Sequence, residues 1–383
     1  MAIKILIVST NRSEFGLLSH IISDTYNQKN IIVKTVISGT HVNKKFGNTI
    51  KEVKKIIKKG IIKIDFQYKK TSDLNNSKFC SALIYKFSHI VNKFQPDFII
   101  IFGDRFETLA FAYVANLMRV NTIHIGGGEK TAGSIDDHYR NAISKLSNFH
   151  FVTHKDHMKR LMQLGENKKN IFISGSPGID VIKKTKLLNK KKLKEQLGFN
   201  LENNKILLIS FYPESNNVKK DKLNIENLLN ALKLFTHYKI IFTLPNLDSS
   251  SDVMIKEIAN FKKKYKNVSI YKSLGSLKFL SLLKNVDIFI GNSSSGLIEA
   301  PILKTKVINI GDRQKGRLMP KGIWHCKNNS SSIIRAINNC LKTDKINYEK
   351  IYPNINTSQY IVKKIKYLSK VFNIKKFVDY NIL

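Results

Sequence analysis

The sequence has few of the features that mark secreted, membrane-spanning or metal-binding proteins. Its three cysteines, Cys80, Cys326 and Cys340, are far apart and form no CxxC pair. This argues against a disulfide framework or a zinc site and favours reduced thiols in a cytoplasm. No stretch approaches the roughly 18 uninterrupted apolar residues that a transmembrane helix needs. Residues 1–12 read as a strand and a polar turn, without the apolar core and cleavage site of a signal peptide. We therefore expect a cytoplasmic protein with no membrane partner.

Two common nucleotide motifs are also absent. Neither the GxGxxG fingerprint nor a GxxxxGK[ST] P-loop occurs, which argues against dinucleotide binding and P-loop chemistry. His154 and His157 stand three residues apart without a third ligand, and Asp136 and Asp137 do not have DxD spacing. The sequence therefore gives no reason to expect a metal ion.

Acidic residues are scarce, because 28 Asp and Glu face 65 Lys and Arg and the formal net charge is +37. Such a charge raises the alternative of nucleic-acid or anionic-membrane binding. The lysines are nevertheless spread along the whole chain, and no basic segment is interleaved with aromatic residues. Arginine is rare, and five arginines lie in Gly/Ser/Asp-rich turns: Arg12, Arg105, Arg140, Arg313 and Arg317. Because arginine suits planar, bidentate recognition, we interpret these positions as marking a site and expect no nucleic-acid partner.

A chain of 383 residues exceeds what one hydrophobic core usually serves. Short apolar, β-branched runs alternate with helix-compatible segments, and a second such series begins near residue 205. This pattern predicts two α/β domains with mostly parallel sheets, over residues 1–177 and 178–356. A helix over 357–372, within a C-terminal segment 357–383, is expected to pack back on the first domain. We also predict a core helix over Phe79–Phe94, one basic helix over Lys183–Lys194 and a helical segment over Leu297–Leu303.

Three carboxylates of the first domain lie in turns that follow predicted strands. They are Asp104, Glu129 and Asp136, and two arginines, Arg105 and Arg140, stand beside them. Ligands of open α/β sheets sit at the carboxyl ends of strands, where a carboxylate is placed to act as an acid or a base. The alternative is that Asp104 and Asp136 are helix caps. Because three such turns occur in consecutive strand–helix units, we favour a catalytic role over simple helix capping.

The second domain carries a different set of groups in its strand-end turns. Residues 291–296 read GNSSSG and precede a helix-compatible segment, whose free N–H groups favour an anion. Residues 311–317 read GDRQKGR and add two guanidinium groups, which suit phosphate oxygens. We interpret the pair as a cradle for a phosphorylated ligand, the alternative being an ordinary turn with a Ser cap. Asn246 follows another strand and suits a nucleobase or ribose, unless Pro245-Asn246 is only a turn.

Assembled in order, these segments resemble the hydrolysing UDP-N-acetylglucosamine 2-epimerases of sialic acid biosynthesis. The resemblance covers Ile3 to Arg317 and rests on NRSEFG (11–16), SGTHV (38–42), FGNTI (46–50), GDRFE (103–107), GGEKT (127–131), DDHYRNAISKLS (136–147), GSPGID (175–180), PNLD (245–248), GNSSSGLIE (291–299) and INIGDRQKGR (308–317). It implies two facing Rossmann-like domains of the glycosyltransferase-B type, with a nucleotide sugar in the interdomain cleft. It also implies no cofactor, no metal and a homodimer.

Matched position by position, the family pattern implies roles for individual residues. Asp104 and Asp136 become catalytic carboxylates with Arg140 beside them. Many members have an acidic residue where this chain has Gly126, and Glu129 is the candidate to replace it. Tyr212 stands where the family often has a histidine, and it can still donate a hydrogen bond to phosphate. The UDP-binding positions are Arg12, Arg105, Tyr212, Asn246, Ser293, Ser294, Glu299 and Arg313.

The reaction that the resemblance implies has two steps. The C2 proton leaves and UDP is eliminated to give a 2-acetamidoglucal, and water then adds at C1 while C2 is reprotonated on the other face. With UDP-N-acetylglucosamine the product is N-acetylmannosamine. Three alternatives remain open: the same reaction on UDP-N,N′-diacetylbacillosamine for legionaminic acid synthesis, a glycosyltransferase on the same fold, and a nucleic-acid binder suggested by charge alone.

Overall fold

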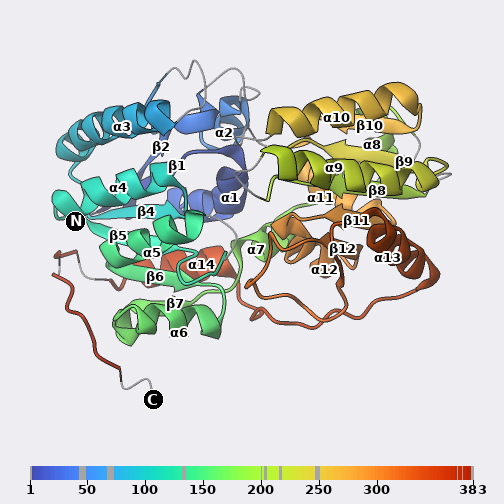
Figure 1. Cartoon of the computed structure of the whole chain (residues 1–383). Helices are drawn as coiled ribbons and strands as arrows, with labels where there is room; N and C mark the ends of the chain where they lie inside the picture. The colour runs from blue at the N-terminus through green and yellow to red at the C-terminus, as the bar shows by residue number, and fades with distance from the viewer. Residues whose placement is uncertain are drawn as a thin grey trace. The chain divides into compact units, whose positions relative to one another are not determined.

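The computed structural model describes residues 2–42, 49–66, 73–131, 135–199, 201, 205–214, 218–245, 251–368, 370–372 and 374–380. The chain divides into two compact units (Figure 1). Unit 1 comprises Met1–Lys130, Ile135–Val181 and Tyr352–Leu383, and unit 2 comprises Ile182–Ile351 with Thr131–Ser134. Each unit has a parallel sheet with helices on both faces. The predicted fold class of two Rossmann-like α/β domains is therefore confirmed.

The described part of unit 1 has a seven-stranded sheet in the order β3-β2-β1-β4-β5-β6-β7, with every neighbouring pair parallel. Its strands are β1 (Ile3–Ser9), β2 (Ile31–Ile37), β3 (Ile61–Lys63), β4 (Phe98–Phe102), β5 (Asn121–Ile125), β6 (Phe149–Val152) and β7 (Ile171–Ile173). In β1, Ile5 and Ile7 face one core and Leu6 and Val8 face the other. Such strands read as continuous apolar runs because both faces are covered. The strand order reverses between β1 and β4, which is where this fold binds ligands.

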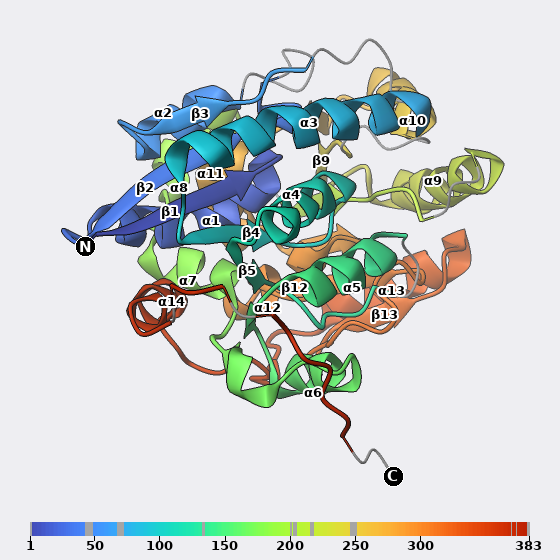
Figure 2. The ribbon, with the colours of Figure 1, turned by 90° about the vertical axis from the view of Figure 1, so that its left-hand side faces the viewer.

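The unit 1 helices form two layers. They are α1 (Arg12–Tyr26), α2 (Ile50–Ile56), α3 (Asp73–Phe94), α4 (Phe106–Leu117), α5 (Asp136–Leu146), α6 (Lys155–Gln163), α7 (Pro177–Lys184) and α14 (Thr357–Ile365). Figure 2 shows α3, α4 and α5 side by side over one face. The predicted core helix is confirmed but begins earlier, at Asp73, and its Phe79, Leu83 and Phe87 side chains are almost fully buried.

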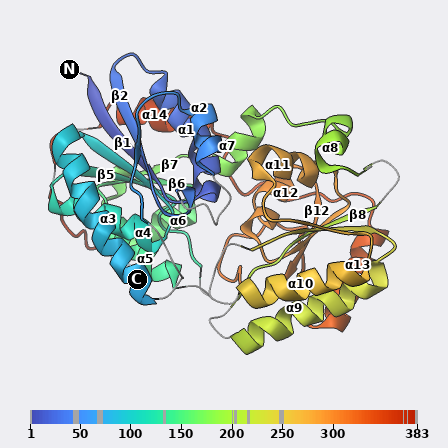
Figure 3. The ribbon, with the colours of Figure 1, turned by 90° about the horizontal axis from the view of Figure 1, so that it is seen from above.

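Helix α14 brings the end of the chain back to unit 1, where it lies beside α1 (Figure 3). Ile361 and Ile365 are fully buried in the same core as the α1 residues Leu18 and Ile21. The helix ends at Ile365 rather than at residue 372, and Leu368, which follows the helix, still packs against the same core.

The segment after α14 contacts the end of helix α5. Lys375 Nζ donates to the backbone carbonyls of Ser144, Lys145 and Ser147, at 3.1, 3.0 and 2.6 Å. It also lies 2.5 Å from the buried Glu166 carboxylate. The last carbonyls of a helix lack intrahelical partners and carry partial negative charge, so a cation stabilises them. A residue distant in sequence therefore helps to hold α5, the helix that carries Arg140.

The described part of unit 2 has a six-stranded parallel sheet in the order β10-β9-β8-β11-β12-β13. Its strands are β8 (Ile206–Ser210), β9 (Lys239–Thr243), β10 (Val268–Tyr271), β11 (Ile288–Gly291), β12 (Lys306–Ile310) and β13 (Trp324–Cys326). Its helices are α8 (Lys190–Leu197), α9 (Val218–Leu232), α10 (Ser251–Lys264), α11 (Gly275–Asn285), α12 (Glu299–Ile302) and α13 (Ser330–Lys342). The strand order reverses between β8 and β11, which is the position where sheets of this fold class bind ligands.

Two further helix predictions differ from the structure in their bounds. The expected helix over 183–194 is two helices, α7 and α8, because Asn189 caps α8 by accepting a hydrogen bond from Lys192 N at 2.9 Å. The expected helical segment over 297–303 is a three-residue 3₁₀ turn (Ser294–Gly296) followed by the four-residue α12. Proline in a helix interior removes a hydrogen bond, and Pro301 is accommodated because it lies in the first turn of α12.

No helix in the described ranges combines the length and the apolar character needed to cross a bilayer. The three cysteines are all unpaired.

The buried face of α14 gives a stability test. Replacing Ile361, which is fully buried, by alanine should lower the free energy of unfolding by about 2–5 kcal/mol, because the cavity in the core is only partly refilled. Urea unfolding followed by far-UV circular dichroism measures the loss. Ile374→Ala is the matched control, since that side chain is 84% exposed. Equal stabilities of the two variants would contradict the packing of α14 on unit 1.

Candidate functional site

The loop after β4 places charged side chains at the edge where the unit 1 strand order reverses. Gly103 has a φ of +80°, and Asp104 and Arg105 follow it. Arg105 forms a bidentate pair with the buried Glu107, with Nε–Oε2 at 3.0 Å and Nη2–Oε1 at 3.3 Å. The Glu107 carboxylate raises the pKa of Arg105 above its ordinary value. Arg105 is thus a fixed cation beside the candidate carboxylates, among which Asp136 also acts on it electrostatically.

Arg140 on α5 joins three segments of this edge. Its side chain is almost fully buried, and Nη2 donates to Asp104 Oδ2. Nη1 donates to the Glu129 carbonyl at 2.9 Å and to Asp137 Oδ1 at 3.5 Å. The structure therefore brings together Asp104, Arg140 and the backbone of Glu129, and it places Asp136 in the first turn of the same helix.

A buried histidine that sequence reasoning missed supports the Gly103 turn. His124 of β5 lies with Nε2 2.8 Å from the Gly103 carbonyl and Nδ1 3.1 Å from Ser144 Oγ. Burial lowers the pKa of His124 to about 3, so the ring is neutral. We assign Nε2 as donor to the carbonyl and Nδ1 as acceptor from the hydroxyl. A histidine between two isoleucines of the predicted strand was the only sequence signal for it.

Glu14 on α1 is a second residue that sequence reasoning missed. Its Oε2 accepts hydrogen bonds from the Thr10 hydroxyl at 2.7 Å and the Thr10 N–H at 3.2 Å. Burial raises its pKa to about 7, against the opposing effect of the nearby Arg105. Asn11 caps α1, because its side chain accepts a hydrogen bond from Glu14 N. Glu14 is therefore the third residue of the helix, a position from which a carboxylate commonly accepts hydrogen bonds from backbone N–H groups that precede the helix. That spacing was the available signal. The predicted binding residue Arg12 is the first residue of α1.

The corresponding edge of unit 2 collects the turns after β8, β11 and β12. Ser293 Oγ accepts from Ser295 N at 3.3 Å and caps the 3₁₀ turn that Ser294 begins. Glu299 opens α12, and burial raises its pKa to about 7 against the opposing effect of Arg317. Its Oε2 is buried and has no hydrogen-bond partner among the described residues. A buried, unsatisfied acceptor of this kind suits a hydroxyl donor from a ligand.

Arg313 and Tyr212 also lie at this edge. The Arg313 guanidinium is 5.1 Å from the centroid of the Tyr212 ring, and its Nη1 donates to the Asn292 carbonyl at 3.1 Å. The structure thus brings Tyr212, Arg313 and the turn that contains Ser293 together. Asn246, the remaining predicted binding residue, lies outside the described residues.

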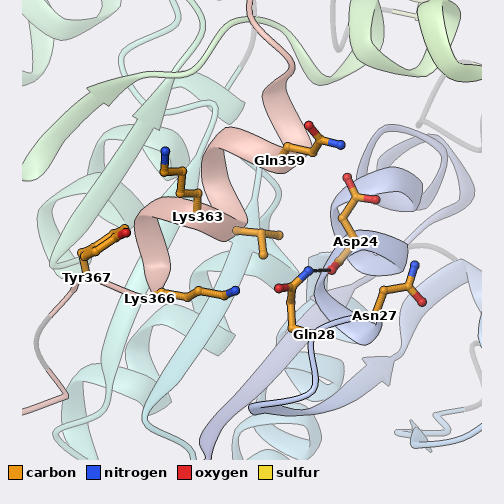
Figure 4. Close-up of a pocket in the computed structure, with 8 residues that line it drawn as sticks. Asp24, Asn27, Gln28, Gln359, Lys363, Lys366 and Tyr367 are labelled. Carbon is orange, nitrogen blue, oxygen red and sulfur yellow. Dashed lines mark hydrogen bonds between the residues drawn. The ribbon is translucent and has the colours of Figure 1, made fainter.

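A separate pocket lies on unit 1 between the last residues of α1 and helix α14 (Figure 4). Asp24, Asn27, Gln28, Lys363 and Lys366 are among its lining residues, and the Gln28 side chain donates to the Asp24 carbonyl. Because Asn27 and Gln28 precede β2, this pocket is at the amino-end edge of the sheet, away from the predicted residues. We do not assign it to the site.

The described edges combine acid–base groups with several arginines and hydroxyls, at two strand-order reversals. This combination is typical of an α/β enzyme that binds a phosphorylated ligand. The family model described as UDP-N-acetylglucosamine 2-epimerase matches residues 24–366. The chain belongs to this family.

Individual relatives agree with this assignment. The chain is 39% identical over 321 residues to the GDP/UDP-N,N′-diacetylbacillosamine 2-epimerase (hydrolyzing) of Campylobacter jejuni, covering 84% of this chain and 83% of the relative. It is 30% identical over 375 residues to the UDP-N,N′-diacetylbacillosamine 2-epimerase (hydrolyzing) of Legionella pneumophila, covering 97% and 98%. It is 29% identical over 387 residues to a UDP-N-acetylglucosamine 2-epimerase of Neisseria meningitidis, covering 99% and 100%.

Solved structures support the fold. The UDP-GlcNAc 2-epimerase from Neisseria meningitidis bound to UDP-GlcNAc has a TM-score of 0.81 at 19% identity, covering 96% of this chain and all of that one. The Methanocaldococcus jannaschii enzyme in complex with UDP-GlcNAc and UDP has a TM-score of 0.79 at 20% identity, covering 95% of this chain and all of that one.

Glu14 gives a pH test. Because its pKa is raised from 4.5 to about 7, the native state binds this proton more tightly than the unfolded chain does. The stabilisation is full below pH 4.5 and is lost as the pH rises to about 7. Relative to Glu14→Gln, which does not titrate, the parent should lose about 1.4 kcal/mol of unfolding free energy per pH unit in this window. Urea unfolding between pH 5 and 8 measures the difference.

Glu195→Gln is the control for this series, because Glu195 is exposed. Its stability should follow the parent at every pH. If Glu14→Gln also follows the parent, the raised pKa of Glu14 is rejected.

Proposed function

We propose that this protein is a hydrolysing 2-epimerase that converts a UDP-linked 2-acetamido sugar and water into UDP and the free 2-epimer. The observation that carries the proposal is the Asp104–Arg140 pair at the strand-order reversal of unit 1. It places a carboxylate, held by a buried cation, where this fold binds its ligands. Membership of the epimerase family supports the same chemistry.

The proposed reaction balances as an elimination followed by a hydration. A base removes the C2 proton, the C1–O bond breaks, and its electron pair leaves with UDP to give a 2-acetamidoglucal. Water then adds its oxygen at C1, and an acid delivers a proton to the other face of C2. Asp104, Glu129 and Asp136 are the proposed acid–base groups, and Arg140 positions Asp104. Water as the second reactant makes the product a free sugar rather than an epimeric nucleotide sugar.

The proposed nucleotide contacts use the edges of both sheets. In unit 2, Arg313 suits the negative charge that develops on the departing UDP oxygen, and in unit 1, Arg105 suits an anionic group of the ligand. The buried Glu299 Oε2 suits a ribose hydroxyl, since it has no partner among the described residues. The other proposed contacts are Arg12, Tyr212, Asn246, Ser293 and Ser294.

The proposed sugar is N,N′-diacetylbacillosamine. Relatives that bear this substrate in their names share 39% and 30% identity with the chain. N-acetylglucosamine is the second candidate, because a relative named for UDP-N-acetylglucosamine is 29% identical over nearly the whole chain. One relative's name gives GDP beside UDP, so the nucleotide also needs testing.

A proton NMR time course in deuterated water tests reaction and substrate together. We expect UDP-N,N′-diacetylbacillosamine to give UDP and a 2-epimer with deuterium at C2, with kcat/KM about tenfold or more above that for UDP-N-acetylglucosamine. The reverse ratio would select the second candidate. The GDP-linked sugar, assayed in parallel, identifies the nucleotide. Product that appears only when an acceptor is added would indicate a glycosyltransferase, and no turnover of any substrate would reject the proposal.

The role of Asp104 is tested by Asp104→Asn. The variant should lose about 10²- to 10⁴-fold in kcat, because the amide cannot exchange a proton with C2 or water. The UDP dissociation constant should stay within about threefold, since the substitution preserves shape. Asp97→Asn is the matched control. Asp97 precedes β4, whereas Asp104 follows this strand, and the Asp97 carboxylate accepts a hydrogen bond from Lys4 N. Near-normal turnover of Asp104→Asn would rule out an essential acid–base role.

A further inference from the structure

Asn292, the residue after β11, is fully buried at the carboxyl edge of the unit 2 sheet. Its side chain forms two hydrogen bonds with the backbone of Tyr212. Oδ1 accepts from the Tyr212 N–H at 2.7 Å, and Nδ2 donates to the Tyr212 carbonyl at 2.8 Å. The amide thus binds Tyr212 as a neighbouring peptide would, and it fixes the backbone from which the ring projects.

The backbone carbonyl of Asn292 holds the turn after β12. It accepts from Arg313 Nη1 at 3.1 Å and from Gln314 Nε2 at 2.7 Å. Gln314 is 2% exposed, so its bond is shielded from water. The Arg313 guanidinium also packs on the Tyr212 ring, so Asn292 contacts both members of this pair, Tyr212 through its side chain and Arg313 through its backbone carbonyl.

Glu214 joins the same turns from the other side. A Cβ built on Gly311 would lie 2.2 Å from Glu214 Oε1, so the carboxylate packs directly on this glycine. Burial raises the pKa of Glu214, against hydrogen bonds from the Asn292 side chain and the Arg313 backbone. The turns after β8, β11 and β12 therefore form one connected polar structure around Asn292.

We propose that Asn292 is a positioning residue for the diphosphate of the nucleotide. It acts through Arg313 and Tyr212, which it holds in the arrangement that receives phosphate oxygens. A guanidinium that is already oriented loses less conformational freedom on binding, so preorganisation strengthens phosphate recognition specifically. The inference rests on the proposed function, because it assigns these turns to the nucleotide.

A double-mutant cycle tests the proposal by calorimetric titration with UDP and with uridine. Asn292→Ala removes both side-chain hydrogen bonds to the Tyr212 backbone, so it should weaken UDP binding by about tenfold, the scale of two lost hydrogen bonds between neutral groups, and change uridine binding by less than about twofold. Asn292→Ala keeps the backbone carbonyl that Arg313 binds, so its effect should pass through Tyr212. In a Tyr212→Ala background, Asn292→Ala should therefore weaken UDP binding no further, because the ring that the Asn292 side chain positions is already absent.

Asn285→Ala is the control, since Asn285 is a unit 2 asparagine whose Nδ2 donates to Ser281 O within α11. It should leave both titrations unchanged. Equal weakening for UDP and uridine, or losses that add fully to those of Tyr212→Ala, would reduce Asn292 to a structural role and overturn the proposal. Asn292→Ser repeats the cycle if the alanine variant does not fold.

The unsubstituted protein separates this inference from the proposed function. If it fails to bind UDP, the proposed function is rejected and the positioning role with it. If it binds UDP and the Asn292 variants bind equally well, only the positioning role is rejected.

Discussion

The buried guanidinium of Arg140 is the constraint on which the unit 1 edge depends. Arginine stays protonated in a protein interior, and an unpaired buried charge is strongly destabilising. Asp104, the Glu129 carbonyl and Asp137 supply the acceptors that make its burial tolerable. These acceptors come from the turn after β4, the turn after β5 and the first turn of α5. Satisfying one cation therefore fixes the relative positions of three segments that are separate in sequence.

Helix α5 is held by cations at both ends. Arg140 acts near its start, where Asp136 and Asp137 also favour the positive end of the helix dipole. Lys375 acts on the unpaired carbonyls at its end, together with the buried Glu166. The last described segment of the chain thus influences a helix that carries candidate catalytic groups, although this segment and the helix are far apart in the sequence.

The parts of the fold that the sequence predicted are those with a long, regular pattern. Strands such as β1 and β4 are continuous apolar runs, whereas β3 and β13 have three residues each, too few to show a period. The separation of α7 from α8 was missed because lysines continue across it and a single cap, Asn189, marks the restart. The length of helix α12 was overestimated, because the apolar residues around Pro301 suit a helix better than the proline does.

The candidate site was predictable where a residue's place in a turn defines its role. Asp104 was recognised from such a turn. Arg140 was also expected in a turn but lies within α5, where it contacts Asp104. Glu14, His124 and Asn292 were not recognised, because contacts with distant segments define what they do. The electrostatic partner of Glu14 is 91 positions away at Arg105, and His124 supports the Gly103 turn of a neighbouring strand. No local pattern contains that information.

Strand register explains how Asn292 reaches Tyr212. In the parallel pairing of β8 with β11, Gly291 lies opposite Ser210, so the residues that follow each strand emerge side by side. Gly291 has a φ of +146°, and a Cβ there would lie 2.0 Å from the Ser210 carbonyl oxygen, so only glycine allows this approach. A slip of one residue would turn the Asn292 side chain to the opposite face of the sheet. The close pairing at Gly291 therefore sets the geometry of the turns beyond it, and the apolar strands that fix this register also fix the position of the polar groups at their ends.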